Sequence, residues 1–213
     1  MKKLLILAAM LVLAASCARD KAPKYLVLYY SQTNTTKAVA EEIATALGAD
    51  LEAILPVIPY DGDMGATAAR CAKDAAEGQL PELKPFNVDV NAYDVIFLGY
   101  PIWMGTYAPP VAAALEAVNL EGKKVVPFCT FGSGGLDTST NDLKAKLPNA
   151  EILPGYGVRA ARIDAYLRKV EELFGRTSNA EKSGVPRLIH GQNWLVPETD
   201  QADELLELIR LSR

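Results

Sequence analysis

Four hydroxyl side chains crowd into a six-residue segment near the start of the chain. Residues 31–36 read Ser-Gln-Thr-Asn-Thr-Thr and follow a β-rich apolar run, Tyr25 to Tyr30, which is expected to be a buried strand. The amphipathic pattern of residues 35–47 predicts a helix that this segment opens. Helix N-termini offer free N–H groups and the positive end of a dipole, so they bind anions. One hydroxyl is enough to cap a helix, so the excess of hydroxyls favours a phosphate site in this segment. Its candidate residues are Ser31, Gln32, Thr33, Asn34, Thr35 and Thr36.

A second segment places a large aromatic ring after another apolar run. Tyr93 to Gly99 is expected to be a strand, and residues 99–106 then read Gly-Tyr-Pro-Ile-Trp-Met-Gly-Thr. Proline stiffens this loop, and its glycines, Gly99 and Gly105, would let the backbone approach a ligand. A flat heterocycle could stack on Trp103, although a tryptophan that caps the sheet as core is the alternative. The candidate binding residues are Pro101, Ile102, Trp103, Met104 and Gly105.

A third loop is rich in glycine and follows the expected strand at residues 123–130. It reads Thr-Phe-Gly-Ser-Gly-Gly over residues 130–135. A glycine cluster alone is weak evidence, but the two loops above make a shared site credible. The candidates here are Thr130, Phe131, Gly132, Ser133 and Gly134.

Strands and helices alternate five times along the chain. Further strands are expected at residues 49–57 and 151–158, and further helices at residues 64–78, 109–118, 142–147 and 163–174. This alternation predicts an α/β fold with a doubly wound, five-stranded parallel sheet, because right-handed crossovers allow few other arrangements. Ligands bind such sheets at the carboxyl ends of the strands, where the strand order reverses.

The three loops together resemble those of the flavodoxin family, over roughly residues 24–175. The resemblance implies the strand order 2-1-3-4-5 and a bound flavin mononucleotide (FMN), with the phosphate at residues 31–36 and Trp103 on one flavin face. It also implies that backbone N–H groups of residues 130–134 line the pyrimidine side. Asn34 stands where the family has glycine, and asparagine is the least costly replacement in a left-handed conformation. The tyrosine that covers the other flavin face is missing, so Phe131 or Tyr107 replaces it or that face is open.

The first residues have the pattern of an export signal. Lys2 and Lys3 precede an apolar run, Leu4 to Ala15, and the small residues at positions 14–16 lead to Cys17. This resembles a bacterial lipobox, which implies a signal peptide at residues 1–16 and lipidation at Cys17. A secretory signal and a membrane anchor are the alternatives, but the run is shorter than the roughly 20 residues that a membrane span needs. We expect an exported lipoprotein facing the periplasm or cell exterior, with a tether at residues 17–24.

Three functions are compatible with these features. An electron carrier that exchanges electrons with a partner protein or quinone is favoured, because nicotinamides are cytoplasmic and the signal directs this chain out. An FMN-dependent NAD(P)H:quinone reductase is the alternative, although no G-x-G-x-x-G motif is present. The intact hydroxyl loop and Trp103 argue against a domain that has lost its cofactor. No catalytic acid, base or nucleophile is predicted.

The composition of the chain argues against two further classes of function, nucleic-acid binding and metal binding. The formal net charge of −4 and the lack of basic runs argue against nucleic acid. The sequence has a single histidine, His190, and we therefore predict no metal site. Cys71 and Cys129 are expected to be buried thiols, although a disulfide is the alternative.

Residues 25–175 form the expected domain, and residues 176–213 are expected to be a helical extension that packs on it rather than a partner-binding element.

Overall fold

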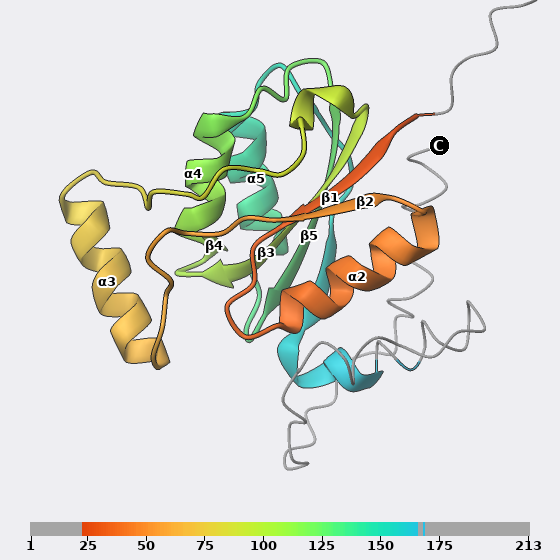
Figure 1. The fold of residues 1–213 in the computed structure, drawn as a ribbon. Helices are drawn as coiled ribbons and strands as arrows, with labels where there is room; N and C mark the ends of the chain where they lie inside the picture. The colour runs from red at the N-terminus through yellow and green to blue at the C-terminus, as the bar shows by residue number, and fades with distance from the viewer. Residues whose placement is uncertain (1–22, 166–167, 169–213) are drawn as a thin grey trace, which may run out of the picture.

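The computed structural model describes residues 23–165 and 168. The chain forms a sheet covered by helices on both faces (Figure 1). The predicted lipidation site Cys17, most of the helix expected at 163–174 and the expected extension at 176–213 lie outside the described residues. Within the described part of the chain, no helix combines the length and the apolar character that a membrane crossing requires.

The sheet has the order β2-β1-β3-β5-β6, which confirms the predicted order when β6 is counted as the fifth strand. Its strands are β1 (Tyr25–Tyr29), β2 (Asp50–Ala53), β3 (Val95–Trp103), β4 (Thr106–Tyr107), β5 (Lys124–Phe131), β6 (Glu151–Ile152) and β7 (Tyr156–Arg159). All pairs are parallel except β3 with β4, which form a short antiparallel hairpin. Because β1 is paired on one side with β2 and on the other with β3, the strand order reverses beside β1.

Four helices connect these strands: α2 (Thr35–Leu47), α3 (Met64–Ala76), α4 (Pro109–Ala117) and α5 (Leu136–Lys146). Two short 3₁₀ turns, Val90–Ala92 and Ala160–Arg162, complete the order of elements. In Figure 1, α2 covers one face of the sheet and α4 and α5 cover the other, while α3 lies at the periphery. The short helix expected at 142–147 is thus only the second half of α5.

Three strand predictions had the wrong bounds. The strand expected at 93–99 continues to Trp103, because residues 102–103 pair with β4. The strand expected at 49–57 ends at Ala53, and Pro56 forms only an isolated bridge with Leu83. The strand expected at 151–158 is broken into β6 and β7, which pair with opposite ends of β5.

The core has two layers, one on each face of the sheet. Along β1, Val27 packs on the side of α2, whereas its neighbours Leu26 and Leu28 pack on the side of α4. All three side chains are fully buried. Burial on both faces explains why the central strands have continuous apolar sequences instead of alternating ones.

The two remaining cysteines are free, buried thiols on separate elements, as expected. Cys71 lies on α3 and Cys129 on β5. Burial raises the pKa of Cys129 to about 12 and also raises that of Cys71. Both side chains are therefore protonated thiols at neutral pH, and not reactive thiolates.

Candidate functional site

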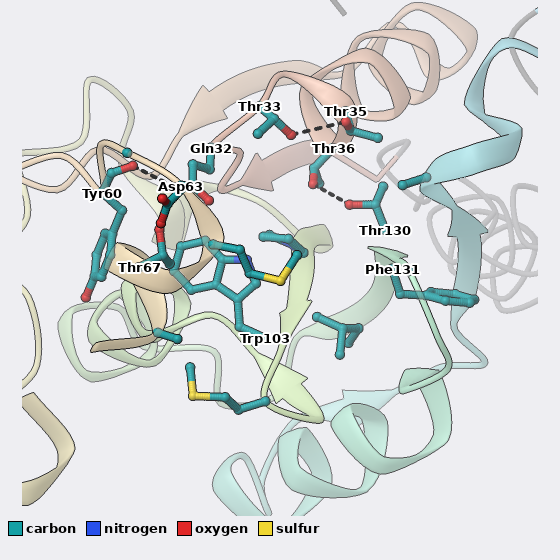
Figure 2. Close-up of a pocket in the computed structure, with 18 of the residues that line it drawn as sticks. Gln32, Thr33, Thr35, Thr36, Tyr60, Asp63, Thr67, Trp103, Thr130 and Phe131 are labelled. Atoms are coloured by element: carbon teal, nitrogen blue, oxygen red, sulfur yellow. Dashed lines mark hydrogen bonds between the residues drawn. The ribbon is translucent and has the colours of Figure 1, made fainter. Parts of the chain in front are cut away.

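A cavity of about 800 Å³ lies at the carboxyl ends of β1, β3 and β5 (Figure 2). Four segments and one residue near the end of the described chain line it. The lining residues are Gln32, Thr33, Thr35, Thr36, Tyr60, Asp61, Gly62, Asp63, Met64, Thr67, Ala68, Pro101, Ile102, Trp103, Met104, Thr130, Phe131, Gly132 and Ala160. The fold thus brings all three predicted loops to one cavity beside the reversal of strand order.

The first loop bends at Asn34, whose φ of 63° is in the left-handed region. This conformation, in which asparagine is tolerated, lets α2 begin at Thr35 with its N-terminus towards the cavity. The Asn34 side chain makes no capping hydrogen bond. The N-terminal N–H groups of α2 therefore keep their capacity to bind an anion.

The hydroxyl groups of this loop differ in their surroundings. Thr33 and Thr35 share an exposed hydrogen bond of 3.2 Å between their hydroxyl oxygens, and Thr36 shares a buried one of 2.8 Å with Thr130 (Figure 2). The hydroxyl of Ser31 is buried and has no hydrogen-bond partner among the described residues. A buried hydroxyl without a partner is costly, so Ser31 has an unused donor in this loop. Ser31 and Asn34 are not among the residues that line the cavity, whereas Thr33, Thr35 and Thr36 are.

Gln32 lines the cavity and also contacts two other elements. Its side-chain Nε2 donates to the carbonyl oxygen of Tyr60 at 2.7 Å and to the hydroxyl of Thr67 at 2.9 Å. The amide group thereby ties the hydroxyl-rich loop to the loop after β2 and to α3. Gln32 joins two walls of the cavity, and its amide N–H groups are already engaged.

Trp103 is half-buried and lines the cavity between two tyrosine rings. Its ring centroid lies 5.5 Å from that of Tyr30 at an interplanar angle of 89°, and 5.2 Å from that of Tyr60 at 65°. Edge-to-face contacts of this kind are favourable and fix the orientation of a ring. The indole thus has one side supported by the core and another exposed to the cavity (Figure 2).

The hairpin tip next to Trp103 contributes Pro101, Ile102 and Met104 to the cavity lining, but not Gly105. Met104 has a φ of 49°, which is unusual for a residue with a long side chain, and it is 65% exposed. Gly105 has a φ of 88° and completes the tight turn. Gly105 is therefore required by the geometry of the turn, whereas its predicted ligand contact stays a prediction.

The glycine-rich loop contributes Thr130, Phe131 and Gly132, whereas Ser133 and Gly134 do not line the cavity. Gly134 and Gly135 have φ values of 72° and 122°, which ordinary residues avoid. A Cβ on Gly135 would lie 2.6 Å from the side chain of Ile102. These glycines serve to bring the start of α5 close to the hairpin tip.

Neither aromatic candidate for the second stacking ring faces Trp103. The Phe131 ring points away from Trp103 towards β7 (Figure 2), where a Cβ on Gly157 would lie 2.8 Å from it. Tyr107 packs against Tyr100 at 6.0 Å and lines a separate cavity of about 570 Å³. Among the described residues, neither of these two rings is thus placed to stack opposite Trp103.

The comparisons with known proteins agree with this geometry. Residues 24–172 match the model of a family described as flavodoxin. The chain belongs to the flavodoxin family.

Solved structures with the same fold include a protein from Bacteroides eggerthii DSM 20697 assigned as a flavoprotein. It is 32% identical to the chain with a TM-score of 0.59, and the alignment covers 70% of this chain and 98% of that one. A second, from Bacteroides uniformis ATCC 8492, is 26% identical with a TM-score of 0.62 and coverages of 73% and 100%. A flavoprotein from Lactobacillus acidophilus NCFM, solved in complex with FMN, is 27% identical with a TM-score of 0.56 and coverages of 68% and 98%. No curated protein sequence matches.

This flavodoxin has one cavity wall that the sequence did not predict. It comprises residues 60–64, Thr67 and Ala68, from the loop after β2 and the first turns of α3. Asp63 begins α3 by accepting a hydrogen bond of 2.8 Å from the backbone N–H of Ala66. A signal was available, since β2 runs parallel to β1 and the loop that follows it must reach the same edge of the sheet.

The cavity of this flavodoxin is lined by neutral and acidic groups. Among the described residues, the lining includes the carboxylates of Asp61 and Asp63 and no lysine or arginine. Burial raises the pKa of Tyr60 to about 12, so its hydroxyl is neutral at physiological pH. Among the described residues, no group of three or more histidine, cysteine or acidic side chains is placed to hold a metal ion. The first loop can therefore bind an anion through neutral N–H and O–H donors.

Proposed function

We propose that this flavodoxin binds FMN non-covalently in the cavity of Figure 2 and acts as an electron carrier. The observation that carries the proposal is the first loop, where α2 begins after a left-handed Asn34 and where Thr33 and Thr35 line the cavity. The buried, unpartnered hydroxyl of Ser31 fits the same interpretation. A similar flavoprotein from Lactobacillus acidophilus NCFM was solved with FMN.

In this proposal the protein positions and tunes the cofactor. Thr33 and Thr35 donate to the phosphate together with the first N–H groups of α2, without a neutralising cation. Trp103 supports one face of the flavin ring, and residues 130–132 lie along its edge. Bound FMN supplies the electron-transfer chemistry. The retained phosphate charge and the carboxylates of Asp61 and Asp63 disfavour adding negative charge to the ring, which lowers its reduction potential.

Replacing Trp103 with alanine tests the cavity as the flavin site. We expect FMN and riboflavin to bind more weakly by about 2 kcal/mol each, because stacking and burial are lost for the ring that both share. Trp103→Phe, which keeps a smaller aromatic face, should lose less. Flavin titrations followed by absorbance measure the change, and wild-type affinity in Trp103→Ala would remove Trp103 from the site.

An FMN-dependent NAD(P)H:quinone reductase is the second candidate, favoured by the positions of Phe131 and Tyr107, neither of which faces Trp103. A flat hydride donor or acceptor could stack on a flavin face that no aromatic ring covers. An anaerobic NADPH titration of the FMN-loaded protein separates the two candidates. We expect the flavin to stay oxidised until an artificial reductant is added, whereas prompt bleaching by NADPH would favour the reductase.

We also propose export and attachment to a membrane through lipidated Cys17, with the carrier facing the periplasm or cell exterior. Lys2, Lys3, the apolar run and the position of Cys17 support this part. A partner protein or a quinone at the same membrane would exchange electrons with the flavin. Membrane fractionation of the full chain and of Cys17→Ser tests the attachment, because only the wild type should sediment with membranes.

A further inference from the structure

The unpredicted wall of the cavity is held to the rest of the molecule by few buried side chains. Of the 13 residues of α3, only Thr67 and Cys71 are buried. Figure 1 shows α3 at the periphery, joined by long connections at both ends. Hydrophobic burial by α3 itself is therefore small, so polar contacts contribute to the position of this helix.

Gln32 ties this wall to the first loop through Tyr60 and Thr67, and Arg70, on α3, holds the loop that leads into the wall. Its Nη1 donates to the carbonyl oxygens of Ile58 at 3.1 Å and of Pro59 at 2.7 Å. Its Cζ lies 3.9 Å from the centre of the Tyr60 ring, and its Nε lies 3.6 Å from a carboxylate oxygen of Asp74. One guanidinium group thus holds three consecutive residues of the loop, two by their backbone and one by its ring.

The Tyr60 ring lies between Arg70 and Trp103 and contacts both side chains. Tyr60 is only 4% exposed, and its ring contacts both the Arg70 guanidinium and the indole of Trp103. The other ring against Trp103, that of Tyr30, follows β1 directly and is also buried, and the Tyr30 backbone N–H donates to the carbonyl of Gly99 in β3. Tyr60 belongs instead to the loop after β2, which Arg70 holds at Ile58 and Pro59.

We propose that Arg70 is a positioning residue, which fixes the orientation of Trp103 through the Tyr60 ring. The inference rests on the proposed function only in that Trp103 supports the flavin. Arg70 does not line the cavity, and its donors are directed to two carbonyl groups and to Asp74. It therefore acts through Tyr60 and not by contact with FMN. The planar guanidinium can stack on a ring and donate at its edge at once, whereas the lysine ammonium cannot.

The test observes Trp103 directly. The chain has two tryptophans, so a Trp194→Phe background leaves Trp103 as the only indole emitter. In this background, Arg70→Gln, Arg70→Lys and the control Lys73→Gln are compared in the full chain. Lys73→Gln removes an exposed positive charge from the same helix. Acrylamide quenching of the flavin-free protein and the affinities for FMN and riboflavin are measured.

We expect quenching of Trp103 to rise about twofold in Arg70→Gln, and the affinities for FMN and riboflavin to fall together by about tenfold. Arg70→Lys should behave like Arg70→Gln, and Lys73→Gln like the wild type. Circular dichroism checks the fold, and Arg70→Lys keeps the charge on α3 should Arg70→Gln unfold.

Three results would overturn the inference. Wild-type quenching in Arg70→Gln would show that Trp103 does not depend on Arg70, and full recovery in Arg70→Lys would show that charge alone is needed. A loss confined to FMN would place the guanidinium at the phosphate instead. If the wild type binds neither flavin, the proposed function fails, and the quenching series still decides the role of Arg70.

Discussion

Thr33→Val combined with Thr35→Val is expected to weaken FMN binding by about 3 kcal/mol, or roughly 150-fold, and riboflavin binding by about threefold or less. Both hydroxyls line the cavity and are exposed, and they bond to each other in the absence of ligand. Hydrogen bonds to a charged phosphate contribute about 1.5–3 kcal/mol each, and riboflavin has no phosphate to accept them. Valine keeps the branched shape of threonine, so the loop should keep its fold.

Isothermal titration of both flavins into the wild type and the double variant measures this difference. Thr45→Val is the matched control, because its hydroxyl bonds to the carbonyl of Glu41 within α2 and does not line the cavity. It should leave both affinities unchanged. Equal losses for FMN and riboflavin in the double variant would mean that the phosphate lies elsewhere.

The parts of this flavodoxin that the sequence predicted well are those where one local rule determines the structure. Central strands such as β1 are buried on both faces, so their apolar runs could be recognised without knowledge of their partners. The left-handed Asn34 followed from the local chemistry of asparagine and from the family pattern. The convergence of three loops followed from the parallel order, because carboxyl ends of parallel strands share an edge.

The parts that were missed depend on contacts between distant segments. Tyr60 and Thr67 belong to the cavity because Gln32, some 30 residues earlier, binds both of them. No local sequence pattern predicts these two hydrogen bonds. Phe131 is an aromatic residue that could stack on a flavin, but its ring points towards β7 and packs beside Gly157, which has no side chain. The break between β6 and β7 likewise reflects pairing with opposite ends of β5.

Gly99 shows how such a contact changes the interpretation of a residue. The sequence suggested that this glycine lets the backbone approach a ligand. In the structure it lies inside β3, directly opposite Phe128 of β5, and it does not line the cavity. A Cβ on Gly99 would lie 2.1 Å from Cζ of the Phe128 ring. The glycine is therefore required by the packing of a core ring, and a ligand contact is the wrong explanation.

Gly99→Ala is accordingly expected to lower the free energy of unfolding by about 3 kcal/mol, measured by urea denaturation of the flavin-free protein. The Phe128 ring is only 1% exposed, so it cannot move into solvent to relieve the clash. Gly132→Ala is the control, because its Cβ would meet no atom within 4 Å. It should change the free energy of unfolding by less than about 1 kcal/mol.

A second substitution separates the two explanations of Gly99. Phe128→Leu removes the ring that the new Cβ would strike, so the double variant should be more stable than the sum of the two single losses implies, by about 1–2 kcal/mol. Additive losses would mean that the clash is not the cause. Wild-type stability of Gly99→Ala together with weakened FMN binding would instead favour the ligand contact, and would place the backbone of β3 nearer the cofactor than the cavity lining indicates.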